Sequence, residues 1–258
     1  MNYFQNGTVI MTNKLIFKMV YCALFIALTY AATFININLG VVGMLHLGVF
    51  VAILASLLFG GVVGGIAGSV GMGLYDITRG YSITTYLRTF IVKFIVCFVI
   101  GLIFDLLMKK DKKYRFIELV LAIVFATIGI ASLLLYILKP DFITQQDIKT
   151  ILLLIAAILS LVFSILFVVL FMIYHRFDQR ENNVIIAASI GIIINIILEF
   201  ILRAILMSLL AENYTFNQAI SLSAIKLPAS VINGFLTLVL VVGLYYPIYK
   251  ATKPLIKR

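Results

Sequence analysis

The chain alternates long apolar runs with short polar segments over most of its length. Several runs reach about 20 residues, the length at which an α-helix crosses a hydrocarbon layer roughly 30 Å thick. The runs are continuous, whereas strands of a membrane β-barrel would alternate apolar and polar positions over about 10 residues. The pattern therefore predicts an all-α polytopic membrane protein with eight transmembrane helices, at residues 15–34, 44–59, 61–77, 85–108, 116–138, 148–174, 184–210 and 224–249.

The composition agrees with a membrane-embedded chain. Of the 258 residues, 64% are hydrophobic and only 12% are charged, and the mean hydropathy is +1.18. Soluble domains carry about 25% charged residues. No linker is long enough to separate two domains, so we expect one membrane domain over residues 1–258. Met11 resembles a natural start, and residues 1–12 are therefore expected to form a disordered leader.

The Lys and Arg residues predict how the chain is oriented. The net charge of +10 would suit nucleic acid, but the positive residues stand between apolar runs, as topology signals do, and we expect no nucleic-acid partner. With the N-terminus inside, the inner segments hold 13 of the 20 Lys and Arg residues: Lys14, Lys18, five residues within 109–115, Arg176, Arg180, Lys250, Lys253, Lys257 and Arg258. We therefore expect a multi-pass protein of the bacterial cytoplasmic membrane with both termini in the cytoplasm.

Small residues form two stripes with a spacing of three or four positions. Residues spaced in this way let membrane helices approach closely. The first stripe lies in a glycine-rich segment and is expected to pack helices; it consists of Gly60, Gly64, Gly68 and Gly71. The second stripe, on the first helix, consists of Ala23, Ala27 and Ala31. Either stripe can serve internal packing, and the alanine stripe can also receive a helix of a partner protein.

Polar and charged residues interrupt the outer halves of several predicted helices. They are Asp76, Arg79, Arg88, Lys93, Asn195, Glu199, Arg203, Lys226 and Asn233. Charged groups at membrane depth are costly and normally face a cavity, a partner or water, so the pattern predicts a polar cavity near the outer end of the bundle. Three simpler alternatives remain at this point. Glu199 and Arg203 could neutralise one another, Arg88 could extend to the membrane interface, and Asp76 could pair with Arg79.

The chain lacks the motifs of common catalytic and nucleotide-binding sites. It has no GxxxxGK[ST] loop for ATP, and its glycines have neither GxGxxG spacing nor a preceding strand. The two histidines, His46 and His175, cannot form a zinc cluster by themselves. Cys22 and Cys97 lie inside apolar runs, as small buried hydrophobic residues do. We expect no enzyme, no metal and no cofactor.

About half of the chain resembles a known family. The segment 46–103 starts with HLGVFVAILASLLFGG and is similar to the S component, the substrate-binding subunit, of energy-coupling factor (ECF) vitamin transporters, most of all to the riboflavin-type group. The shared positions are Phe59, Gly60, Gly64, Gly68, Gly71, Leu74, Asp76, Gly80, Tyr81, Thr89, Lys93 and Gly101. The last predicted helix also resembles that of the family, through KLPASVINGFLTLVLVVGLYYPIYK, and Ala23 and Ala27 match its AxxxA motif.

The resemblance implies an S-component-like helical bundle that captures a vitamin from outside. In the family, the AxxxA face docks on a transmembrane coupling subunit, which acts with two ABC-type ATPases. Six helices are usual in the family and eight are predicted here. The two additional helices therefore indicate an inserted transmembrane hairpin at residues 116–174. Val49 stands where relatives often have Asp. Gly61 takes the place of the proline in the usual Phe-Gly-Pro turn. The substrate therefore stays open between riboflavin, a vitamin B6 or pyrimidine compound, and pantothenate.

The candidate substrate site combines loop residues with the polar residues of the outer helix halves. It consists of Asn36, Asn38, Asp76, Tyr81, Arg88, Lys93, Asn195, Glu199, Lys226 and Asn233. A rival hypothesis is a stand-alone proton-coupled secondary transporter, in which Glu199, Asp76 or Lys93 would relay protons. A third hypothesis is an assembly protein whose pocket is vestigial. Only the extra hairpin supports this hypothesis.

Overall fold

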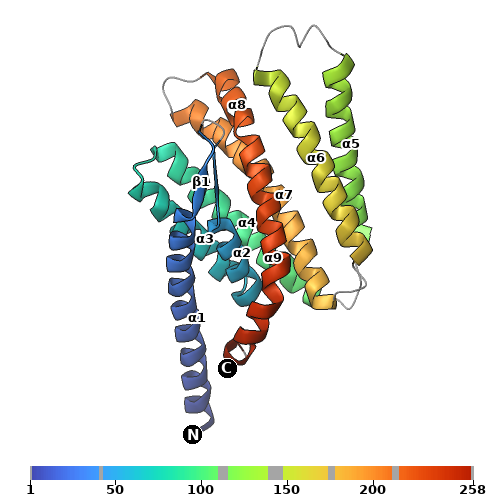
Figure 1. Cartoon of the computed structure of the whole chain (residues 1–258). Helices are drawn as coiled ribbons and strands as arrows, with labels where there is room; N and C mark the ends of the chain where they lie inside the picture. The colour runs from blue at the N-terminus through green and yellow to red at the C-terminus, as the bar shows by residue number, and fades with distance from the viewer. Residues whose placement is uncertain are drawn as a thin grey trace.

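The computed structural model describes residues 2–40, 43–109, 116–138, 148–173, 178–210 and 215–256. These residues form nine helices and one antiparallel pair of strands (Figure 1). The elements in chain order are α1 (Asn2–Phe34), β1 (Asn36–Asn38), β2 (Met44–His46), α2 (Gly48–Phe59), α3 (Gly61–Thr78), α4 (Ile83–Lys109), α5 (Phe116–Leu138), α6 (Ile148–Ile173), α7 (Gln179–Leu210), α8 (Phe216–Ile225) and α9 (Leu227–Ile256).

The predicted class, an all-α membrane protein, is confirmed. Five stretches of the described helices are long and apolar enough to cross a membrane: Leu15–Phe34, Ile83–Lys109, Phe116–Leu134, Gln179–Leu210 and Leu227–Lys253. Two more apolar stretches are shorter, Gly48–Phe59 and Ala157–Met172. The predicted spans correspond to α1–α7 and α9, but the number of eight membrane crossings stays a prediction.

Three parts of the chain differ from the expectations. Residues 2–12 form the first turns of α1, where the sequence suggests a disordered leader. The second helix begins at Gly48 rather than at residue 44, because residues 44–46 form β2 and pair with β1. The last helix is preceded by α8, whose N-cap residue Thr215 forms a reciprocal capping box with Gln218.

The turn between α2 and α3 depends on Gly60. Its backbone has φ 96° and ψ 162°, a conformation that residues with a Cβ rarely adopt. A Cβ at Gly60 would meet nothing within 4 Å, so the turn, and not crowding around this position, requires glycine here. Its role in helix packing stays a prediction, and its backbone lies beside Gly101 of α4. The other three glycines of the stripe lie where helices meet: Gly64 faces Ser56 of α2, Gly68 faces Ala52 and Cys97, and Gly71 faces Thr29 of α1.

The helices pack around a continuous apolar core. α4 lies between α3 and α7, α1 covers α2 and α3, and α9 contacts α2 and α7. Ile53, Val92 and Ile100 in the centre of this bundle are fully buried. The antiparallel pair of α5 and α6 lies to one side and extends this core by packing on α9, where the rings of Phe163 and Phe235 are 5.8 Å apart (Figure 1).

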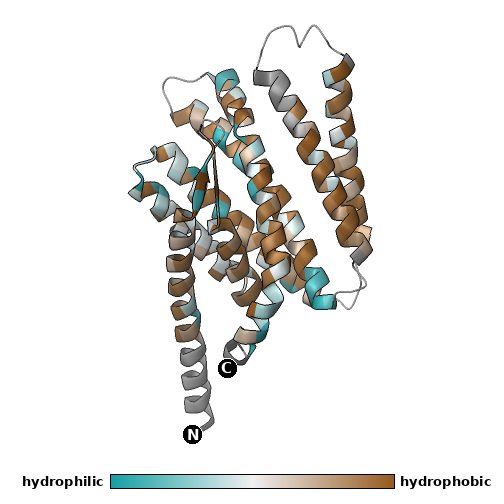
Figure 2. Ribbon diagram, viewed as in Figure 1, coloured by the Kyte–Doolittle hydropathy of each residue, from teal (hydrophilic) through white to brown (hydrophobic). Residues whose placement is uncertain are grey.

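The two ends of the bundle differ. Both ends of the chain lie at one end, and the β1–β2 hairpin and α8 lie at the other (Figure 1). Apolar residues dominate the middle of the helices, whereas hydrophilic residues gather near the ends (Figure 2). Large apolar side chains such as Leu24, Ile123 and Val239 are exposed on the outside, as expected where a helix contacts lipid. The polar site described next lies at the end that carries the hairpin.

Candidate substrate-binding cavity

A polar cavity of about 580 Å³ lies beneath the β1–β2 hairpin. Its walls come from α1, both strands, α3, α4, α7 and the start of α9. All ten residues of the candidate substrate site line this one cavity: Asn36, Asn38, Asp76, Tyr81, Arg88, Lys93, Asn195, Glu199, Lys226 and Asn233. The structure thus brings together residues up to 197 positions apart, namely from Asn36 to Asn233. That these residues bind a substrate stays a prediction.

Three of the asparagines hold the hairpin in place over the cavity. Asn36 Nδ2 donates hydrogen bonds to the carbonyl of Thr33 at 3.0 Å and to Tyr75 Oη at 3.2 Å. Asn233 Oδ1 accepts the backbone N–H of His46 at 3.1 Å, which ties β2 to α9. Asn38 Oδ1 accepts the N–H of Gly40 in the hairpin turn. These amides therefore shape one wall of the cavity through bonds within the protein.

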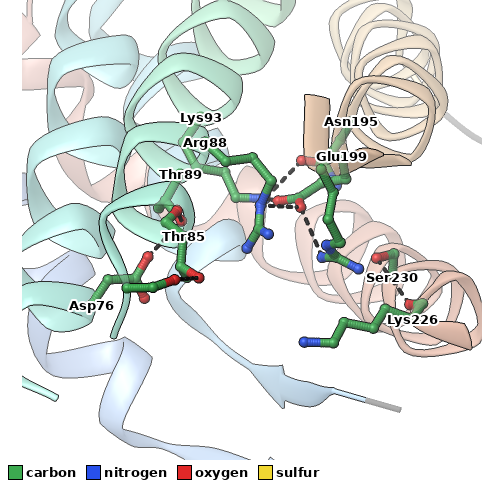
Figure 3. Close-up of polar contacts among 11 residues, drawn as sticks. Asp76, Thr85, Arg88, Thr89, Lys93, Asn195, Glu199, Lys226 and Ser230 are labelled. Atoms are coloured by element: carbon green, nitrogen blue, oxygen red, sulfur yellow. Dashed lines mark hydrogen bonds and ion pairs between the residues drawn. The ribbon is translucent and has the colours of Figure 1, made fainter. Parts of the chain in front are cut away.

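Glu199 is the centre of a buried charge network. Its Oε1 accepts a hydrogen bond from Lys93 Nζ at 2.8 Å, and its Oε2 lies 3.1 Å from both Arg88 Nε and Arg203 Nη2 (Figure 3). Lys93 Nζ also donates to Asn195 Oδ1 at 2.8 Å. The four charged side chains are between 7% and 14% exposed. Buried charges persist only when they are paired, so the network fixes these side chains against the cavity wall.

This network decides two of the three simpler alternatives left open by the sequence. Glu199 and Arg203 do pair at four-residue spacing, but Glu199 also binds two cations from α4. Arg88 turns inward to Glu199 and does not extend to the membrane interface, as Figure 3 shows. The simple neutralising pair is therefore only one part of a four-residue cluster.

Asp76 lies on the opposite wall and binds a hydroxyl rather than a cation. Thr89 Oγ1 donates a hydrogen bond to Asp76 Oδ2 at 2.5 Å (Figure 3). The expected alternative, a pair with Arg79, is not formed, because the Arg79 guanidinium lies over the rings of Phe34 and Tyr75, 5.2 and 5.5 Å from their centres. Asp76 is 5% exposed, so its carboxylate is held at the cavity wall between α3 and α4.

Lys226 reaches the cavity from the junction of α8 and α9. Its side chain makes no ion pair with any acidic residue in the described ranges, and Figure 3 draws no contact to its ammonium group. Burial lowers the pKa of Lys226, and the positive charges of Arg203 and Arg88 lower it further, although Glu199 opposes them. Lys226 is thus a cation placed near two other cations.

Eight further polar or charged residues line the cavity without belonging to the ten candidate-site residues: Thr33, His46, Tyr75, Arg79, Thr85, Thr89, Arg203 and Ser230. A signal for two of them exists in the sequence, because Thr85, Thr89 and Lys93 are spaced four apart and share one face of α4. His46 lies in β2, which apolar periodicity alone does not reveal. Within the described part of the chain, no three His, Cys, Asp or Glu residues are grouped closely enough to hold a metal ion.

Comparison with known families gives one result that covers most of the chain. The model of a family described as the ECF-type riboflavin transporter, S component, matches residues 13–176, which is more than half of the 258 residues. The chain belongs to this family. No curated protein and no solved structure matches the chain. The family is one of transporter components and is not a class of enzymes.

The matched segment covers only one side of the cavity. It includes α1–α6 and the hairpin, whereas Asn195, Glu199, Lys226 and Asn233 all follow residue 176. The cations of α4 therefore lie in the matched part of this S component, and the carboxylate that binds them lies beyond it. The match therefore does not identify riboflavin as the substrate of this cavity, because part of the cavity wall lies outside the matched residues.

The alanine stripe of this S component lies on its outer surface. Ala23, Ala27 and Ala31 are all exposed, while Thr29 and Thr33 on the other face of α1 are buried. The extra pair of helices is also peripheral: among the described lining residues, none comes from α5 or α6. The cavity, the α1 face and the α5–α6 pair are thus three separate regions of the molecule.

Proposed function

We propose that this S component captures a small water-soluble vitamin or vitamin precursor from outside the cell for ATP-driven uptake. The candidates are riboflavin, a vitamin B6 or pyrimidine compound, and pantothenate. The observation that carries the proposal is the cavity of about 580 Å³ with buried polar walls in a member of a transporter family. Ligand sites commonly have volumes of about 300–1,000 Å³ and a few fixed polar groups.

The charge network would serve as a preformed binding surface. Lys93 is held by Glu199 and Asn195, so its ammonium needs little reorganisation when a ligand arrives. Asp76 and Thr89 present an acceptor and a hydroxyl from the facing wall. Tyr81, 41% exposed in the loop between α3 and α4, would cover the ligand from that side. Donors and acceptors on opposite walls suit a polar heterocycle with several hydrogen-bonding groups.

The proposed partners are a transmembrane coupling subunit and two ABC-type ATPases. The exposed Ala23–Ala27–Ala31 stripe would receive the coupling subunit, because small side chains allow close contact between helices in lipid. Both termini would lie in the cytoplasm of a bacterium, and the hairpin end would face outward. The excess of Lys and Arg near the end that carries the termini supports this orientation.

The proposal is tested by uptake into liposomes. The purified S component is reconstituted with and without a coupling subunit and its ATPases, and uptake of radiolabelled riboflavin, pyridoxine and pantothenate is measured. We expect uptake of one vitamin only when the partner subunits and internal ATP are both present. Uptake by the S component alone, driven by a pH gradient, would instead support the proton-coupled transporter.

A further inference from the structure

The charges around the cavity do not balance. Its walls carry five cationic side chains and two carboxylates, Asp76 and Glu199, an excess of three positive charges. One cation, Arg79, is exposed and stacked on aromatic rings, so it contributes little to the interior. The remaining excess is two charges. One belongs to the buried side chains, where unpaired charge is costly, and the other is on Lys226, which lines the cavity but is exposed.

Glu199 cannot neutralise the cations that surround it. Its two oxygens already accept hydrogen bonds from Lys93 and Arg203, and Oε2 also forms an ion pair with Arg88. Arg88 Nε lies 3.1 Å from Glu199 Oε2, but among the described residues this buried nitrogen has no hydrogen-bond partner. Arg203 uses Nη2, while its buried Nε has no hydrogen-bond partner among the described residues. Both guanidinium groups therefore keep donors free beyond the network.

Lys226 completes a group that we name the cationic trio: Arg88, Arg203 and Lys226. Its members come from α4, from α7 and from the α8–α9 junction, so three separate elements bring like charges together. Lys226 lines the cavity, and Figure 3 shows its ammonium group on the same side as Arg88 and Glu199. The positive charges of Arg203 and Arg88 lower the pKa of Lys226, as like charges near one another do.

On these grounds we infer that the cavity takes an anionic ligand, whose carboxylate or phosphate group binds at the cationic trio. The inference rests on the proposed function and narrows its substrate class. A carboxylate carries one negative charge and a phosphate carries about 1.5 to 2, close to the excess that Glu199 leaves. Hydrogen bonds from cations to such oxygens are stronger than neutral ones. A neutral ligand would leave Lys226 without an ion pair among the described residues and Glu199 shared between three cations.

The rest of the ligand would lie against the less charged part of the cavity. Met44, Met72 and Tyr75 line the wall below the hairpin, and Asp76 with Thr89 supplies the polar contacts there. A ring system fits such a surface, because methionine and aromatic side chains contact flat apolar groups well. The ligand would thus place its ring between the hairpin and α3 and its anionic group toward α7.

Three matched pairs of compounds test the inference. Each pair contains an anionic and a neutral form: riboflavin 5′-phosphate and riboflavin, pyridoxal 5′-phosphate and pyridoxal, pantothenate and panthenol. Dissociation constants are measured by calorimetry with the full-length protein in detergent. We expect the anionic member of one pair to bind at least about tenfold more tightly than its neutral partner. The pair that shows this difference identifies the bound anionic group as a phosphate or a carboxylate.

A pair of variants assigns this preference to the trio. Lys226→Gln removes one cation of the trio, and we expect it to reduce the preference for the anionic form about tenfold while binding of the neutral form changes little. Lys250→Gln is the matched control, because Lys250 is exposed near the far end of α9. An anion preference that survives Lys226→Gln unchanged would overturn the role of the trio.

The outcomes separate the two proposals. If a neutral compound binds as tightly as its anionic partner, or more tightly, the anionic class is wrong while the vitamin-binding function stands. If none of the six compounds binds, the proposed function fails for these vitamins and the inference falls with it. Weak binding of every anionic compound alike, reversed by inorganic phosphate, would show a nonspecific anion site and would also overturn the inference.

Discussion

At the scale of single residues, Glu199 makes the contacts that hold the cations of the site together. It is a buried carboxylate that binds three cations, two of which come from α4, about 100 positions earlier in the chain. Removing one partner of a buried ion pair leaves the others without compensation and commonly costs about 3–5 kcal/mol. The residue therefore decides both the geometry of the cations and the stability of the empty protein.

Glu199→Gln should lower the stability of the empty protein by about 3 kcal/mol, because three cations would then face a neutral amide. Thermal unfolding in detergent measures the effect. Glu181→Gln is the control on the same helix: Glu181 only caps the start of α7, accepting the N–H of Asp178. Equal unfolding temperatures for the two variants would contradict the description of the network.

At the scale of secondary-structure elements, close contact between α2 and α3 shapes the wall behind the cavity. A Cβ at Gly64 would collide with Ser56 of α2, whereas a Cβ at Gly243 of α9 would meet nothing within 4 Å. We expect Gly64→Ala to destabilise the protein by about 1–3 kcal/mol through overpacking. Gly243→Ala should be neutral or stabilising by up to about 1 kcal/mol, because alanine favours helix. A stable Gly64→Ala variant would show that the two helices separate easily.

The exposed face of α1 allows a test of partner binding. Ala27→Trp should prevent assembly with the coupling subunit, because the bulky ring keeps a partner helix away. Vitamin binding should be unchanged, since Ala27 does not line the cavity. Co-purification of tagged partner subunits measures assembly, and Ile123→Trp, on the exposed surface of α5, is the control. Normal assembly of Ala27→Trp would remove this face from the proposed interface.

The elements themselves were predictable to different degrees. Long apolar runs predicted α1, α4, α5, α7 and α9 because a membrane helix needs about 20 such residues. The β1–β2 hairpin was missed because its strands are only three residues long and merge with flanking apolar runs. A signal for α8 was present, since Thr215 and Gln218 have capping-box spacing. The pairing of Glu199 with Arg88 and Lys93 depends on how α4 packs on α7, which local spacing does not encode.

At the scale of the whole molecule, the cavity and the chain ends lie at opposite ends of the bundle (Figure 1). This arrangement lets one end receive a ligand while the α1 face remains available to partners in the membrane. The predicted hairpin at 116–174 corresponds to α5 and α6, which pack beside α9 and leave the cavity to the other helices. Its description as an insertion into a six-helix family stays a prediction.

Cysteine labelling in intact cells tests the predicted orientation. Tyr81→Cys lies in the loop at the cavity end, and Lys250→Cys lies near the C-terminal end of α9; both are made in a background without Cys22 and Cys97. A membrane-impermeant maleimide should label position 81 in whole cells and position 250 only after the cells are opened. The reverse pattern would invert the molecule and exclude capture from outside.

The central claim is that the cavity holds a vitamin-like small molecule, and native mass spectrometry of the detergent-purified protein tests it most directly. The bound compound is released, identified by its mass and fragmentation, and counted against the protein. We predict one vitamin or precursor per chain, retained by the native protein and lost in the Glu199→Gln variant. Protein that is consistently empty, and that binds none of the candidate vitamins at micromolar concentration, would contradict the claim.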